Sequence, residues 1–149
     1  MRRPDILGIH HLKFPVAELA RSLEFYERAF GAERVAAYDH IDASGRLFAY
    51  ILSVPGLGVP LELRLNPGVA ARHQGFDPVT LLVGDRADLT RWIEHFASHE
   101  IPHSEILVGA IGWLVVVQDP DGRRLRLYTR ETHGPEEKVS WNSPWLQET

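Results

Sequence analysis

The apolar and polar positions of the first half of the chain predict a strand, a helix and three further strands. Residues 9–16 alternate weakly between apolar and polar side chains, as a half-buried strand does. The apolar side chains that follow have helical spacing, at Leu19, Leu23, Tyr26 and Phe30. Gly31 comes next, where helices commonly end in the left-handed conformation. Strands are then expected at residues 34–42, 47–54 and 59–65.

The second half repeats this order of elements. Residues 78–83 predict a strand, and Asp85 is a candidate N-cap for the next helix. That helix carries its apolar stripe at Leu89, Trp92, Ile93 and Phe96. Strands are expected at residues 104–110, 112–118 and 124–129. Residues 119–122 read Asp-Pro-Asp-Gly, which matches the preferences of a type I turn before the last strand.

The repeat divides the 149 residues into two modules of similar size. We place the first module at residues 6–66 and the second at residues 76–130, with a linker at 67–75. Residues 131–149 form a polar tail that contains Trp141 and Trp145. Because free tails seldom carry tryptophan, we expect this tail to dock on something.

Composition excludes several classes of protein. The chain has no cysteine, so disulfides, thiolate metal sites and cysteine nucleophiles are excluded. The net charge of −4 and the lack of a long basic run argue against nucleic-acid binding. No apolar run is long enough to span a bilayer, and the N-terminus lacks the apolar segment of a signal peptide. We therefore expect a cytoplasmic protein without a membrane partner.

Two motifs carry a resemblance to a known family. The first half opens with IHH, continues through LEFYERAFG, and the second half closes with DPDGRRLRLY. In this doubled order the chain resembles the vicinal oxygen chelate superfamily, over residues 6–130. That family includes glyoxalase I, fosfomycin and bleomycin resistance proteins, extradiol dioxygenases and methylmalonyl-CoA epimerase. The resemblance implies an α+β fold of two βαβββ modules, whose eight strands form a curved sheet around a cup.

The resemblance also implies where a metal would be held. Metal-using members take ligands from the first and last strand of each module, which here are His11, Glu62, Pro78 and Arg126. Proline has no donor atom and arginine stays protonated, so only two of the four positions are suitable. Catalytic metal sites usually keep three protein ligands. We therefore expect no cofactor and a degenerate metal site; a divalent metal held by His11 and Glu62 is the alternative.

Strand alternation predicts which side chains face the cup. Lys13 shares a face with His11, and Arg64 with Glu62. In the last strand Arg124, Arg126 and Tyr128 share the inward face. The predicted ligand contacts are Lys13, Arg64, Arg126 and Tyr128. An excess of positive charge in a concave site attracts an anion, so an organic anion is the expected ligand. We further expect Arg126 to contact Glu62 in place of a metal.

These residues support three hypotheses about function. The first is a metal-free protein of the bleomycin-resistance type that binds a small molecule. Binding would serve either to sequester the ligand or to support an acid–base step by His11 and Glu62. The second is a metal-dependent lyase, isomerase or dioxygenase, and the third is a non-catalytic module whose tail meets a partner. A homodimer is expected, although the modules can pair within one chain or across two. His40 is a weaker candidate beside Glu62, and His95 and His99 are expected on a solvated helix face.

Overall fold

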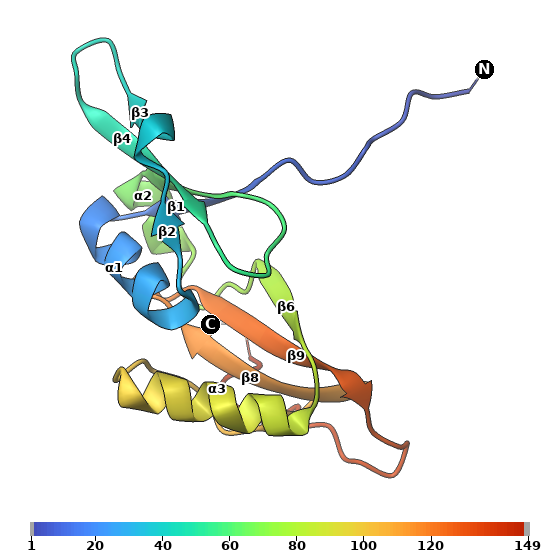
Figure 1. Cartoon of the computed structure of the whole chain (residues 1–149). Helices are drawn as coiled ribbons and strands as arrows, with labels where there is room; N and C mark the ends of the chain where they lie inside the picture. Colours follow the sequence, from blue (N-terminus) through green and yellow to red (C-terminus); the bar gives the residue numbers. More distant parts are fainter. Residues whose placement is uncertain (1, 148–149) are drawn as a thin grey trace.

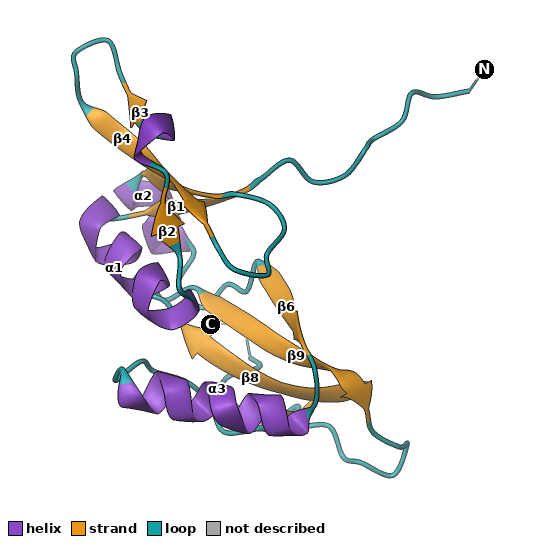
Figure 2. Ribbon diagram, viewed as in Figure 1, coloured by secondary structure: helices purple, strands orange, loops and turns teal. Residues whose placement is uncertain are grey.

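The structure is a computed structural model that describes residues 2–147 and consists of two sheets, each covered by a helix (Figures 1 and 2). The elements of the first module are β1 (Leu12–Val16), α1 (Leu19–Phe30), β2 (Glu33–Arg34), a 3-10 turn η1 (Ala36–Tyr38), β3 (His40–Ile41), β4 (Leu47–Ser53) and β5 (Leu61–Leu65). A short helix, α2 (Pro67–Arg72), joins the modules. The elements of the second are β6 (Val79–Val83), α3 (Arg86–Ser98), β7 (Leu107–Val108), β8 (Gly112–Gln118) and β9 (Arg124–Thr132).

The two sheets have the same strand order. The first sheet runs β1-β5-β4-β2, with β3 also on β4, and the second sheet runs β6-β9-β8-β7. In each sheet the first strand is parallel to the last, and the hairpin strands are antiparallel. The expected α+β class and the two βαβββ modules are therefore confirmed. The sheets remain separate, however; β1 forms one edge of the first sheet and β6 one edge of the second.

The helix ends follow the signals in the sequence. Gly31 ends α1 with a φ of 69°, and its N–H donates to the carbonyl oxygen of Glu27. Asp85 caps α3 by accepting the N–H of Asp88 at 2.8 Å, and the Asp88 side chain accepts the N–H of Asp85 at 2.9 Å. This reciprocal pair is a capping box, which satisfies two helix donors at once. No helix within residues 2–147 has the length and apolarity needed to cross a membrane.

Three segments differ from the sequence-based prediction. The strand expected at residues 104–110 is limited to β7. The strand expected at residues 34–42 is interrupted by η1, in which the N–H groups of Tyr38 and Asp39 donate to the carbonyls of Val35 and Ala36. Those local bonds replace the ladder that a continuous strand needs. Residues 67–75, predicted as a linker, contain the helix α2. Asn66 caps it by accepting the N–H of Val69 at 3.2 Å, and a proline occupies its first turn.

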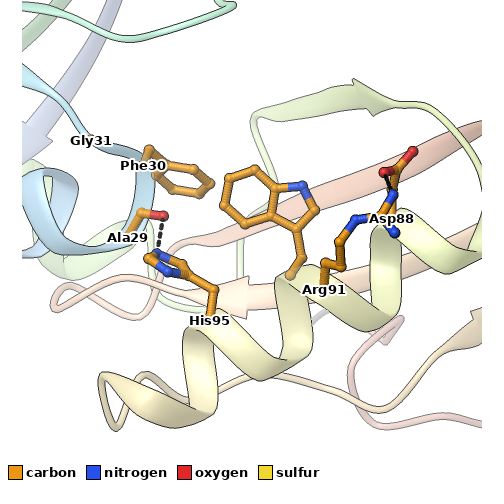
Figure 3. A pocket seen from close by; sticks show the side chains of 7 residues that line it. Ala29, Phe30, Gly31, Asp88, Arg91 and His95 are labelled. Carbon is orange, nitrogen blue, oxygen red and sulfur yellow. Dashed lines mark hydrogen bonds and ion pairs between the residues drawn. The ribbon is translucent and has the colours of Figure 1, made fainter.

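The helices α1 and α3 meet between the modules. The ring of Phe30 lies 5.9 Å from that of Trp92 and 6.2 Å from that of Phe96, measured between centroids. His95 donates from Nε2 to the carbonyl oxygen of Ala29 at 3.1 Å, as Figure 3 shows beside Phe30. This histidine therefore supplies a donor to the last turn of α1, where carbonyls lack helical partners. His95, which was expected on a solvated helix face, is therefore half-buried by its contact with α1.

The packing of both helices into one core decides where the polar faces point. Phe14 of the first sheet and Leu127 of the second belong to the same buried cluster. Lys13 pairs across β1 and β5 with Glu62, on the face opposite Phe14, and Arg126 lies opposite Leu127. We call these two polar sides the outer faces of the first and second sheets. They point away from the shared core, so one chain does not close the expected cup.

A buried ionic network fastens the turn before β9 to the first module. Arg123 is fully buried, and its NH1 donates to Asp119 at 2.6 Å. Tyr26 of α1 donates its hydroxyl to the same carboxylate at 2.7 Å, and the NH2 of Arg123 donates to the carbonyl oxygen of Pro15. Burial raises the pKa of Asp119, and Arg123 opposes that rise. The turn is thus joined to the first module by hydrogen bonds to Tyr26 and to the carbonyl of Pro15.

Candidate functional site

Nitrogen-bearing side chains gather around one buried carboxylate on the outer face of the first sheet. Glu62 of β5 is buried, and its Oε2 accepts a hydrogen bond from Nε of Arg64 at 2.6 Å. Its Oε1 lies 3.7 Å from Nε2 of His11 and 3.5 Å from Nε2 of His40. We call these four residues the Glu62 cluster. The structure therefore brings the predicted His11, Glu62 and Arg64 together.

Strand pairing explains how these side chains converge. The parallel register aligns Lys13 with Glu62, so His11, two residues earlier, shares their face. On the other side of β5, Ala49 of β4 pairs with Arg64. Ala49 also pairs with His40 of β3, so His40 is in register with Arg64. The imidazole of His40 bonds through Nδ1 to the carbonyl of Tyr38 at 2.9 Å, which leaves Nε2 directed at Glu62. Sequence reasoning ranked His40 low because nothing local reveals this cross-strand alignment.

Lys13 adds positive charge beside the Glu62 cluster. Its side chain is exposed and makes no ion pair within the described residues 2–147. The charge of Glu62 is already engaged by Arg64 at hydrogen-bonding distance. Lys13 and Arg64 therefore set two permanent cations against one carboxylate on the outer face of the first sheet. A surface with that balance favours an anionic ligand.

The predicted residues of the second sheet lie on its own outer face. Arg126 forms an ion pair with Asp77 at 2.5 Å and lies in register with Thr80 of β6. The hydroxyl of Tyr128 accepts the N–H groups of Ile111 at 2.9 Å and Gly112 at 3.1 Å. Tyr128 thus holds the turn between β7 and β8, and its predicted ligand contact stays a prediction.

The contact expected between Glu62 and Arg126 is wrong within one chain. Glu62 is engaged by Arg64, and Arg126 by Asp77. The physical reason is the shared core, which holds the apolar faces of both sheets and leaves the two polar faces outside it. Any meeting of Glu62 with Arg126 therefore requires a second copy of the chain.

An apolar cleft lies between the modules, on the helix side of the sheets. Its volume is about 480 Å³. Its lining includes Leu12, Phe14, Val54, Leu57, Val79, Val83 and Trp92. A smaller depression at the helix junction is lined by Phe30, Gly31, Asp88 and His95 (Figure 3). Neither hollow contains the Glu62 cluster, so the cup residues form a separate, outward-facing site.

The donor set does not fit a three-ligand metal centre. The family positions of the second module hold Pro78 and Arg126, which supply no metal ligand. Within residues 2–147, His, Asp and Glu side chains form no group of three arranged to hold a metal ion. His40 is the additional nitrogen near Glu62, yet one oxygen of that carboxylate is bound by Arg64.

Comparisons with known proteins agree with this fold. The chain is 30% identical over 129 residues to MhqA of Bacillus subtilis (strain 168), named as a ring-cleaving dioxygenase. The match covers 83% of this chain but 40% of that protein, so the chain spans less than half of its relative.

Two solved structures share the fold at low identity. TnmS3, an antibiotic-binding protein from Streptomyces sp. CB03234, superposes with a TM-score of 0.67 at 16% identity, covering 87% of this chain and 100% of that one. A variant of the fosfomycin resistance protein FosX from Listeria monocytogenes, complexed with Mn(II) and 1S,2S-dihydroxypropylphosphonic acid, has a TM-score of 0.65 at 13% identity, covering 83% and 90%.

The family assignment rests on the sequence itself. The family model described as "Glyoxalase/Bleomycin resistance protein/Dioxygenase superfamily" matches residues 8–127. This span includes both sheets apart from the end of β9, and it contains His11 and Glu62. The chain therefore belongs to the Glyoxalase/Bleomycin resistance protein/Dioxygenase superfamily, as its vicinal oxygen chelate motifs predicted.

Proposed function

We propose that this protein binds a small organic anion without a metal, using the outer face of the first sheet. The observation that supports this most directly is the charge around Glu62. Arg64 and Lys13 outnumber the single carboxylate, and His11 and His40 add two imidazoles. Ionised partners strengthen hydrogen bonds to carboxylates and phosphates, so this arrangement suits an acid.

The relatives are compatible with such a ligand. TnmS3 is described as binding an antibiotic, and the FosX variant was solved with a phosphonic acid. Both descriptions concern those proteins, and their low identity to this chain supports the fold alone. They show that this fold can present a small-molecule site, while the choice of an anion rests on Lys13 and the Glu62 cluster.

We further propose that the site is completed in a homodimer. One wall of the site would be the outer face of the first sheet of one chain. The other wall would be the outer face of the second sheet, with Arg126, from the partner chain. The edge strands β1 and β6 each lack a strand neighbour on one side within residues 2–147, and natural proteins seldom leave such an edge uncovered. Apolar side chains are exposed at Leu82 in β6 and at Ile9, three residues before β1. Pairing of the edges would cover them.

Removing either cation should weaken anion binding. We expect Lys13→Met and Arg126→Met each to raise the Kd roughly 10-fold or more, because a hydrogen bond to a charged group contributes about 1.5–3 kcal/mol. Calorimetry with aliphatic and aromatic carboxylic and phosphonic acids measures the change. Lys138→Met, which alters an exposed cation in the tail, is the matched control. Equal affinity for neutral analogues, or unchanged binding by both variants, would contradict the proposal.

Metal analysis tests the expectation that the protein holds no divalent metal. We expect protein purified without chelator to contain far less than one divalent metal per chain, because the second module offers Pro78 and Arg126 in place of ligands. Mass spectrometry of the metal content, repeated on His11→Ala and Glu62→Gln, gives the measurement. A stoichiometric metal in the wild type that disappears in both variants would overturn the proposal.

A metal-dependent reaction is the second candidate, and two observations favour it. MhqA, named as a ring-cleaving dioxygenase, shares 30% identity with this chain. In addition, Nε2 of His40 lies near the same carboxylate oxygen as Nε2 of His11. A stoichiometric metal that also required His40 would support this candidate over metal-free binding.

A further inference from the structure

The tail crosses the outer face of the second sheet. After β9, the tail returns so that Trp145 and Leu146 pack on the side of that sheet away from α3. Ser140 extends the edge at β7, with its N–H donating to the carbonyl of Val108 at 2.9 Å and its Oγ accepting the N–H of Val108 at 3.0 Å. Trp145 docks as the sequence led us to expect, while Trp141 remains 67% exposed.

Trp145 and Leu146 rest on a small apolar floor. That floor consists of Leu107, Leu114 and Val116, with Tyr128 at its side. It is separate from the main core, which lies on the opposite face of the same strands. Trp145 and Leu146 are themselves only partly buried. The tail therefore covers this floor without becoming part of the central packing.

Arg124 binds the tail through main-chain oxygens. Its NH1 donates to the carbonyl of Pro144 at 2.9 Å and to that of Gln147 at 2.7 Å. Its guanidinium carbon lies 5.6 Å from the ring centroid of Trp145. The Nε atoms of Arg124 and Arg126 are buried and have no hydrogen-bond partner within residues 2–147. Two adjacent guanidinium groups thus have donors that the described tail does not use.

The tail presents the chemical features of an aromatic acid. An indole ring covers an apolar floor next to a cation, and two oxygen atoms accept from the same guanidinium nitrogen. The carbonyls of Pro144 and Gln147 are neutral acceptors, whereas a carboxylate would add the attraction of opposite charges and could accept two guanidinium N–H groups in parallel. A carboxylate attached to a flat ring would satisfy Arg124 better than Pro144 and Gln147 do.

We propose that this face, around Arg124, is a binding site for aromatic carboxylates, and that residues 144–147 are its internal occupant. The ligand displaces the tail, so the tail lowers the apparent affinity by the fraction of molecules in which it is docked. This inference rests on the proposed anion-binding function, because the same face carries Arg126. Beyond that function, the inference specifies that the ligand is aromatic and that the tail controls its binding.

Indole-3-acetate and its neutral amide, indole-3-acetamide, are the probes. We expect Trp145→Ala to bind the acid about 10-fold more tightly than the wild type, since weakening the occupant frees the site. Trp141→Ala is the matched control and should bind like the wild type, because Trp141 is exposed. Arg124→Met should lose the preference for the acid over the amide. In hydrogen exchange, the acid should increase exchange of residues 138–147 in the full chain.

Each outcome separates this inference from the function on which it rests. If the acid binds and Lys13→Met weakens it, while tail exchange and Trp145→Ala affinity do not change, the tail is not an occupant and the anion-binding proposal stands. Equal binding of acid and amide overturns the carboxylate assignment at Arg124. If neither the wild type nor Trp145→Ala binds indole-3-acetate or indole-3-acetamide, the inference is refuted.

Discussion

Arg123→Met should destabilise the fold by about 3–5 kcal/mol, the cost of breaking a buried ion pair from one side. Asp119 would keep its charge in a buried site and lose the guanidinium that donates to it at 2.6 Å. The change would also remove the bond to the carbonyl of Pro15 in β1, so the modules would lose a connection. Chemical denaturation measures the loss in the free energy of unfolding.

The pH dependence identifies the cause of that loss. Burial raises the pKa of Asp119, and removing Arg123 should raise it further. A carboxyl group with a raised pKa in the folded state contributes its stability at low pH and loses it as pH rises through that pKa. The variant should therefore recover part of its deficit on acidification from neutral pH.

Two further variants test the same explanation. Adding Asp119→Asn to Arg123→Met should reduce the deficit, because the orphaned charge is gone. Arg130→Met, at an exposed position of β9, is the control and should change stability by less than about 0.5 kcal/mol. A loss for Arg123→Met that is the same at every pH, and unaffected by Asp119→Asn, would rule out the buried charge as its source.

Leu82→Glu should convert the proposed dimer to a monomer and abolish tight anion binding. Leu82 is 64% exposed on the edge strand β6. A charge on this edge would be buried without a partner on association, which costs several kcal/mol and shifts the dimer Kd by roughly 100-fold or more. Sedimentation velocity over a range of concentrations measures the assembly, and calorimetry measures the binding.

Ile111→Glu provides the matched control for this change. Ile111 is 66% exposed, in the turn between β7 and β8 at the opposite edge of the second sheet. It should leave assembly and binding unchanged. A wild-type protein that is monomeric yet binds acids through Lys13 would show that one outer face is sufficient, and the composite site would then be wrong.

The helix ends and the repeat were predictable because their causes are local. Gly31 adopts the left-handed conformation expected after a helix, and Asp85 caps the next one with Asp88. Alternation along β1 and β5 also placed Lys13 and Glu62 on one face, as their pairing confirms. By contrast, His40 and the partners of Arg123 depend on strand alignments and contacts between distant segments, which no local pattern contains.

The sequence by itself determined the two modules, their family, and the residues on each polar face, because these follow from periodicity and motifs within short segments. Only the tertiary structure decided which way those faces point. The apolar surfaces of α1 and α3 are buried against each other as well as against their own sheets, so both modules share one core. That burial leaves Glu62 and Arg126 on two separate outer faces, where each finds a different partner.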